Sequence, residues 1–221
     1  MSRLILLHGY IESPAIFDSL RPLLPADTDV RPLELEAEFA DWQPAGRPNV
    51  LGLARHLARK YDIGPADVLL GHSMGGWIAI HLKQLTGARA ILLNSFTDQA
   101  KIVSDVRHPT LLSLYAWSGL MQSRFMRQRF RRDYRRDESR ALHSALVEGL
   151  PGFRRRYLHQ QLQVLFAPAP PLTVQPDLRV HARRDNVIRP PDEPYVEIPG
   201  DHFAHVFYPQ QAAEAILQVL G

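Results

Sequence analysis

The sequence predicts an α/β fold, in which a mostly parallel sheet of about six strands is flanked by helices. Short apolar runs alternate with longer segments of helical periodicity along most of the chain, a pattern typical of parallel sheets covered on both faces. One serine, Ser73, lies between glycines directly after such a run, as at a sharp strand-to-helix turn. With 221 residues, 45% of them hydrophobic, residues 1–221 are long enough to bury one core and are expected to form a single domain.

Each predicted element has its own local signal. Strands are expected at the apolar runs 4–8, 30–33, 67–70, 90–94, 178–182 and 195–198. The second strand is the weakest, because Pro32 has no N–H for pairing. Ser13 and Pro14 are expected to open a helix with an apolar side formed by Ile16, Phe17, Leu20 and Leu24. Further helices are expected after an Asn49 cap and at residues 76–85 and 209–220.

The segment Gly71-His72-Ser73-Met74-Gly75-Gly76 places the serine at the third strand-to-helix turn. A Cβ at Gly71 or Gly75 would crowd such a turn, so small residues are needed there. The following helix N-terminus directs free N–H groups and a partial positive charge towards an anion beside the serine. The pattern indicates Ser73 as a catalytic nucleophile; the alternative is a plain strand–helix turn without chemistry.

A serine nucleophile needs a base that takes its proton and a third group that orients the base. Asp185 follows the fifth predicted strand, and His202 follows the sixth. Both residues therefore fall in loops at the carboxyl ends of parallel strands, where open α/β sheets have their active sites. We expect Ser73, His202 and Asp185 to act as nucleophile, base and orienting acid.

These motifs, together with His8-Gly9-Tyr10 after the first strand, resemble the α/β-hydrolase superfamily over nearly the whole chain, in particular its small esterases and acyl hydrolases. The resemblance implies that the backbone N–H groups of Tyr10 and Met74 form an oxyanion hole. It implies a helical cap inserted at residues 97–172. The two strands that usually precede the His-Gly strand are expected to be missing, which removes no catalytic position.

Several residues compete for these roles. Asp98, in the loop after the fourth strand, is the rival of Asp185. His205 is the rival of His202, which follows its strand more closely and matches the family's Gly-x-His-Phe pattern. Three other histidines are expected to be structural, with His8 holding the oxyanion loop, His72 packing behind the nucleophile and His181 lying in the sheet.

The segment 121–156 is strongly basic. It contains eleven arginines and four acidic residues, a local net charge of +7, whereas the whole chain carries +3. A solvated outer face is the favoured interpretation. An electrostatic collar for anionic substrates or a carrier domain is the alternative. Nucleic acid is not expected as a partner, because no recognition module accompanies the charge.

The remaining composition excludes several classes of site. The chain has no cysteine, and no His, Asp or Glu cluster has the spacing of a metal site. No metal, cofactor, phosphate loop or dinucleotide motif is expected. The N-terminal apolar run is too short for a signal peptide and no run could span a membrane, so a cytoplasmic protein is expected.

The sequence thus predicts a serine hydrolase that cleaves a small-molecule carboxylic ester. An acyl-thioester hydrolase or acyltransferase with the same triad is the alternative, and a non-catalytic binding protein of the same fold is the remote one. The acyl length, the alcohol and the oligomeric state do not follow from the sequence.

Overall fold

The computed structural model describes residues 3–104, 108–134 and 136–220. Its centre is a six-stranded sheet with the strand order β2-β1-β3-β4-β5-β6, in which every neighbouring pair is parallel. The strands are β1 (Arg3–Leu7), β2 (Asp29–Pro32), β3 (Val68–His72), β4 (Arg89–Leu93), β5 (Leu178–Ala182) and β6 (Val196–Ile198). The predicted parallel sheet is therefore confirmed, with ends that differ from the expected ones by a few residues.

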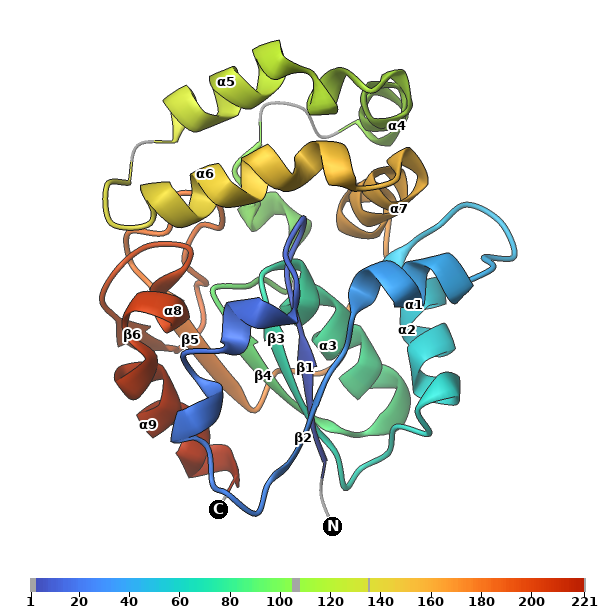
Figure 1. Ribbon diagram of the computed structural model, residues 1–221. Coiled ribbons are helices and arrows are strands. Elements are labelled where there is room, and N and C mark those ends of the chain that lie inside the picture. Colours follow the sequence, from blue (N-terminus) through green and yellow to red (C-terminus); the bar gives the residue numbers. More distant parts are fainter. Residues whose placement is uncertain (1–2, 105–107, 135, 221) are drawn as a thin grey trace.

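Helices cover both faces of this sheet (Figure 1). They are α1 (Leu35–Asp41), α2 (Val50–Lys60), α3 (Met74–Thr86), α8 (Ala204–Phe207) and α9 (Pro209–Leu220). In β1, Ile5 and Leu7 join the core beneath α2 and α3, whereas Leu4 and Leu6 join the core beneath α9. This alternation explains why the central strands are continuous apolar runs, since both of their faces are buried.

Two of the helices begin and end where local chemistry predicts. The Asn49 side chain accepts a hydrogen bond from Gly52 N–H (2.9 Å) at the start of α2, as an N-cap residue does. Helix α3 ends at Gly87, which has the left-handed conformation (φ 76°) common after a helix. The Asn49 cap was expected from the sequence, and the end of α3 at Thr86 lies one residue from the expected end at residue 85.

The helix expected after Ser13 is absent. The chain instead forms two short 3₁₀ helices, η1 (Pro14–Phe17) and η2 (Arg21–Leu23). Pro22 has no N–H for an α-helical bond to the carbonyl four residues earlier, and its ring would meet that carbonyl. The expected apolar residues are nevertheless buried, namely Ile16, Phe17, Leu20 and Leu24.

Four helices are inserted between β4 and β5: α4 (Pro109–Ser118), α5 (Arg124–Asp133), α6 (Arg140–Gly149) and α7 (Arg155–Phe166). Figure 1 shows them together above the carboxyl ends of the strands. They share a small core of their own, and α7 also packs on the main domain, where Trp77 Nε1 donates to Val164 O (3.0 Å). None of the helices in the described ranges is long and apolar enough to cross a membrane.

Gly75 is the glycine that the fold tolerates least well as alanine. An added Cβ would lie 1.9 Å from the carbonyl oxygen of Leu7, which is backbone and cannot move aside. Gly75→Ala should lower the free energy of unfolding by at least about 3 kcal/mol, as measured by urea denaturation. Gly149→Ala, at the end of α6 with no atom within 4 Å of the new Cβ, should leave it nearly unchanged. Equal stability of the two variants would contradict this packing.

Candidate active site

Ser73 lies at the turn between β3 and α3, in a strained backbone conformation (φ 51°, ψ −119°). Such a conformation is rare for a residue with a side chain and persists only where the surroundings enforce it. Here close packing on either side of the serine holds it in this conformation, because a Cβ at Gly71 would lie 2.4 Å from the backbone of Gly75. The turn holds the serine at the carboxyl edge of the sheet, where it is 6% exposed.

The two backbone N–H groups expected to form an oxyanion hole are those of Tyr10 and Met74. Met74 is the first residue of α3, so its N–H has no partner within the helix. Tyr10 lies in the loop after β1, the strand that pairs with β3. In the described part of the chain no hydrogen bond uses the N–H of Tyr10 or Met74. Both groups are therefore available to an anion that forms near Ser73.

The structure brings together Asp185, in the loop after β5, and His202, in the loop after β6. His202 Nδ1 lies 2.9 Å from Asp185 Oδ2 and 3.1 Å from Oδ1. Both side chains are buried, with relative exposures of 8% for Asp185 and 4% for His202. A carboxylate can only accept here, so Nδ1 carries the proton and Nε2 is left to act as a base.

Asn94 is a site residue that the sequence analysis missed. It follows β4 in the left-handed conformation (φ 42°), and its Nδ2 donates to Asp185 Oδ2 (3.0 Å) and to Asp201 O (3.1 Å). The N–H groups of Val187 and Ile188 donate to Asp185 Oδ1 at 2.8 and 2.9 Å. Three donors besides the histidine therefore hold the carboxylate in place. The only sequence signal for Asn94 was its position at a strand end.

Burial and pairing act in opposite directions on the two titratable groups. Burial alone would raise the pKa of the Asp185 carboxyl, but the charge and hydrogen bond of His202 hold it below its usual value. Burial alone would lower the pKa of His202, but the negative charge and hydrogen bond of Asp185 raise it above 6.5. Each group therefore favours the charged form of the other.

Neither rival residue takes part in the Asp185–His202 pair. Asp98 is exposed and accepts a hydrogen bond from Ala100 N–H (2.8 Å) at the start of the 3₁₀ helix η3 (Gln99–Lys101). His205 is fully buried, and among the described residues neither of its ring nitrogens has a hydrogen-bond partner. Burial lowers the pKa of His205 well below 6.5, so its ring stays neutral.

Within the described residues no hydrogen bond joins Ser73 Oγ to His202. Catalytic hydrogen bonds are often long in proteins without substrate and tighten when it binds. The side chains come from the adjoining loops after β3 and β6, and both are almost completely buried.

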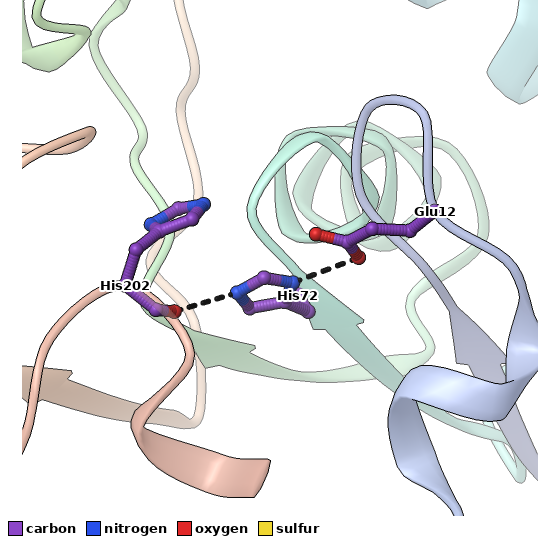
Figure 2. Close-up of side chains that lie close together, drawn as sticks. All are labelled: Glu12, His72 and His202. Carbon is purple, nitrogen blue, oxygen red and sulfur yellow. Dashed lines mark hydrogen bonds and ion pairs between the residues drawn. The ribbon is translucent and has the colours of Figure 1, made fainter. Parts of the chain in front are cut away.

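A second buried network lies behind the serine and was not foreseen. His72, the last residue of β3, lies 3.0 Å from Glu12 Oε2 through Nδ1 and 2.9 Å from His202 O through Nε2 (Figure 2). Glu12, His72 and His202 are the residue types that bind metals, and their ligand atoms lie within 4.8 Å of one another. A metal ion would have to replace hydrogen bonds that already use Glu12 Oε2 and both His72 nitrogens.

The other two histidines have structural contacts. His8 Nδ1 donates to Gly9 O (3.0 Å), and its Nε2 accepts from Leu35 N–H (3.2 Å), so the ring ties the loop after β1 to the start of α1. His181, in β5, donates from Nε2 to Ile188 O (3.2 Å) in the loop that follows this strand.

The inserted helices touch the site at two places. Ser139 Oγ donates to Asp201 Oδ2 and also bonds Tyr134 Oη, which ties the α5–α6 junction to the His202 loop. A cavity of about 320 Å³ lies between Tyr10 and Val187 on the sheet side and the inserted helices. Phe130 of α5 and Val147 of α6 contribute apolar side chains, as do Met121 and Leu150 in the connections between the inserted helices.

None of the arginines of the basic segment is among the described residues that line this cavity. Arg127 and Arg131 form ion pairs with Glu148, and Arg140 pairs with Asp137. Arg155 Nη1 donates to Trp117 O (3.2 Å). Arg135 lies outside the described residues. The four other arginines named thus have partners within the inserted segment.

Several solved structures have a similar fold. A hydrolase from Pseudomonas aeruginosa PA01 has a TM-score of 0.75 at 16% identity, covering 100% of this chain and 90% of its own. An enol-lactonase from Burkholderia xenovorans LB400 has a TM-score of 0.67 at 13% identity, with coverages of 99% and 91%. A thermophilic esterase from Thermogutta terrifontis has a TM-score of 0.65 at 17% identity, with coverages of 100% and 89%.

No curated protein sequence matches this chain significantly. The solved structures above share the parallel-sheet fold of this chain. Residues 4–219 match the model of the Alpha/beta hydrolase family, so the chain belongs to that family.

Proposed function

We propose that this protein is a serine hydrolase that cleaves a carboxylic ester through an acyl-enzyme intermediate. The observation that carries the proposal is the buried Asp185–His202 pair beside the strained Ser73 turn. This combination has a base, a group that orients it and a nucleophile on adjoining loops. The free N–H groups of Tyr10 and Met74 supply the fourth requirement, donors for an oxyanion.

In the first step Ser73 Oγ attacks the ester carbonyl carbon while His202 Nε2 takes the hydroxyl proton. The carbonyl oxygen becomes an oxyanion and accepts hydrogen bonds from the Tyr10 and Met74 N–H groups. Asp185 stabilises the imidazolium without taking its proton. Collapse of the intermediate breaks the ester C–O bond, and His202 returns the proton to the departing alkoxide, which leaves as the alcohol.

In the second step water attacks the acyl-enzyme carbonyl carbon and gives a proton to His202. The Ser73 ester bond breaks, the serine oxygen takes that proton back, and the acid is released. The reaction needs no cofactor. A thioester would follow the same path with a thiol as leaving group, so the two substrate classes are separated by measured turnover of matched oxygen esters and thioesters.

Ser73 is expected to be the residue that becomes acylated. A fluorophosphonate probe should label the protein, with the adduct mapped to Ser73 by mass spectrometry. Ser73→Ala should abolish labelling and lower kcat for an aryl ester by about 10⁴- to 10⁶-fold, as removal of a triad nucleophile does. Ser95→Ala, which removes a nearby hydroxyl that bonds Ser73 O, should keep the labelling. Labelling that survives Ser73→Ala would contradict the proposal, and so would a wild-type protein that neither reacts nor turns over any ester.

Asp185 should control the pH dependence of the reaction. His202 acts as a base only when neutral, so kcat/KM should rise with pH as the ring loses its proton. Asp185 raises the pKa of that ring above 6.5, which places the midpoint of the rise above 6.5 as well. Asp185→Asn removes the charge, so the midpoint should move to lower pH and kcat should fall by about 10⁴-fold.

The matched control for this prediction is Asp98→Asn, which removes the rival carboxylate. Neither the midpoint nor kcat should change in that variant. If Asp98→Asn shifts the pH profile and Asp185→Asn does not, the orienting acid has been assigned to the wrong loop.

The cavity beside Tyr10 is proposed to hold the acyl chain. With a volume of about 320 Å³, it lies at the small end of ligand-binding cavities. For aryl esters of increasing acyl length, kcat/KM should rise by at most about fourfold per methylene, or about 0.8 kcal/mol, and fall once the cavity is full. Phe130→Ala should move the optimum to longer chains. Phe125→Ala, on the same helix but 69% exposed, should leave the optimum in place, and equal shifts in both variants would place the chain elsewhere.

A further inference from the structure

Glu12 is a buried carboxylate that the proposed reaction does not use. It lies in the loop after β1 and is 4% exposed. Removing a carboxylate from water is costly unless hydrogen bonds or an opposite charge compensate. Here Glu12 Oε2 accepts from Gly9 N–H (2.6 Å) and faces His72 Nδ1 (3.0 Å). The side chain therefore folds back onto its own loop and bonds a residue of β3.

The protons of His72 follow from its two neighbours. His72 Nε2 faces the carbonyl oxygen of His202, which can only accept, so Nε2 must carry a proton. His72 Nδ1 faces the Glu12 carboxyl, so one further proton lies between these two groups. The pair is either an imidazolium with a carboxylate or a neutral imidazole with a carboxylic acid. In both forms it has no net charge, and the charge of His72 keeps the pKa of Glu12 below its usual value despite burial.

One end of this pair holds the loop that carries Tyr10. Gly9 N–H is bound by Glu12, and a Cβ at Gly9 would lie 2.7 Å from the Glu12 carboxyl oxygen, so only glycine permits this approach. Ile11 has φ 53°, a strained conformation for a β-branched residue. Its N–H donates to Gln161 Oε1 (3.1 Å) on α7. The N–H groups on both sides of Tyr10 are thus fixed, and Tyr10 N–H alone is left free between them.

The other end of the pair holds the loop that carries His202. The bond from His72 Nε2 ends on the backbone carbonyl of His202 itself, so it fixes the main chain from which the ring projects. The His72 ring lies with its centroid 4.7 Å from that of His202 and 4.3 Å from that of His205. Figure 2 shows His72 between the two loops, with a hydrogen bond on each side.

We propose that Glu12 and His72 are positioning residues that couple the oxyanion loop to the loop of the base. Together they set the distance between Tyr10 N–H and His202, which must serve the same substrate carbonyl and the same serine. The inference rests on the proposed function, because Tyr10 N–H and His202 need a fixed separation only if acyl transfer takes place at Ser73. Such precision matters, since displacing reacting groups by about 1 Å can cost about 10²-fold in rate.

Two conservative changes at Glu12 break different parts of this pair. Glu12→Gln keeps the length, and its amide oxygen can accept from Gly9 N–H. The same oxygen faces His72 Nδ1, however, so a neutral His72 has one proton for two acceptors, the amide oxygen and His202 O, and loses one of its two bonds. Glu12→Asp keeps the charge but is one methylene shorter and cannot make both bonds. If the pair acts by position, kcat for an aryl ester should be about 10²-fold below wild type in Glu12→Asp. In Glu12→Gln kcat should fall by less than in Glu12→Asp, because Gly9 N–H stays bound, and KM should change little in either variant.

The matched control is Glu38→Asp. Glu38 is also 4% exposed and its carboxylate also has two partners, Tyr61 Oη (2.5 Å) and Lys60 Nζ (2.8 Å), but it lies on α1 away from the site. Its substitution should lower the free energy of unfolding, as that of Glu12 does, without lowering kcat. All variants are measured below their unfolding transitions and at a pH at which His202 is neutral.

The outcomes separate this inference from the proposed function. A wild-type protein that does not react at Ser73 removes the proposed function and this inference with it. A wild-type protein that turns over esters, with kcat unchanged in Glu12→Asp, overturns the inference alone. A folded Glu12→Gln variant with kcat at the wild-type level also overturns it, because the two bonds of His72 would then have no effect on the reaction.

Discussion

The close approach of α3 to the strand β1 is the constraint on which the rest of this structure depends. Gly75 lies so near the Leu7 carbonyl that no side chain fits between them, and this contact forces the chain to turn sharply at Ser73. Because β1 and β3 are neighbours in the sheet, the same contact brings the loop after β1 beside the start of α3. This packing contact thus places the loop that carries Tyr10 and the turn that carries Ser73 and Met74 at the same end of neighbouring strands.

Much of this arrangement could be predicted from the sequence, because it depends on signals that are local. Ser73 and its glycines occupy six consecutive positions, and Asp185 and His202 each follow an apolar strand. Parallel strands place their carboxyl ends at one edge, so residues far apart in sequence could be expected to meet there. The first helix was predicted wrongly because its apolar spacing suits either kind of helix and Pro22 decides between them.

The supporting residues could not be predicted, because their partners are remote and their types are ordinary in loops. Glu12 bonds a histidine 60 positions away, Asn94 bonds Asp185 across 91 positions, and Gln161 reaches Ile11 across 150. No periodicity links such pairs, and a loop Glu, Asn or Gln is most often solvated. The cavity could not be predicted for the same reason, since its shape depends on how α5 and α6 pack over the sheet.

The supporting contacts around His202 share one effect, which is to set how strongly its ring holds a proton. In the proposed reaction the ring gains and then returns one proton, so its surroundings must favour the imidazolium only moderately. Asp185 supplies one compensating charge, and Asn94 and two backbone N–H groups spread that charge so that the carboxylate stays ionised. An unpaired carboxylate at Glu12 would add a second negative charge, strengthen the hold of His202 on its proton and slow the return of that proton to the leaving group. The Glu12 charge does raise the pKa of His202, and the His72 proton beside the Glu12 carboxylate weakens that effect while the pair holds both loops.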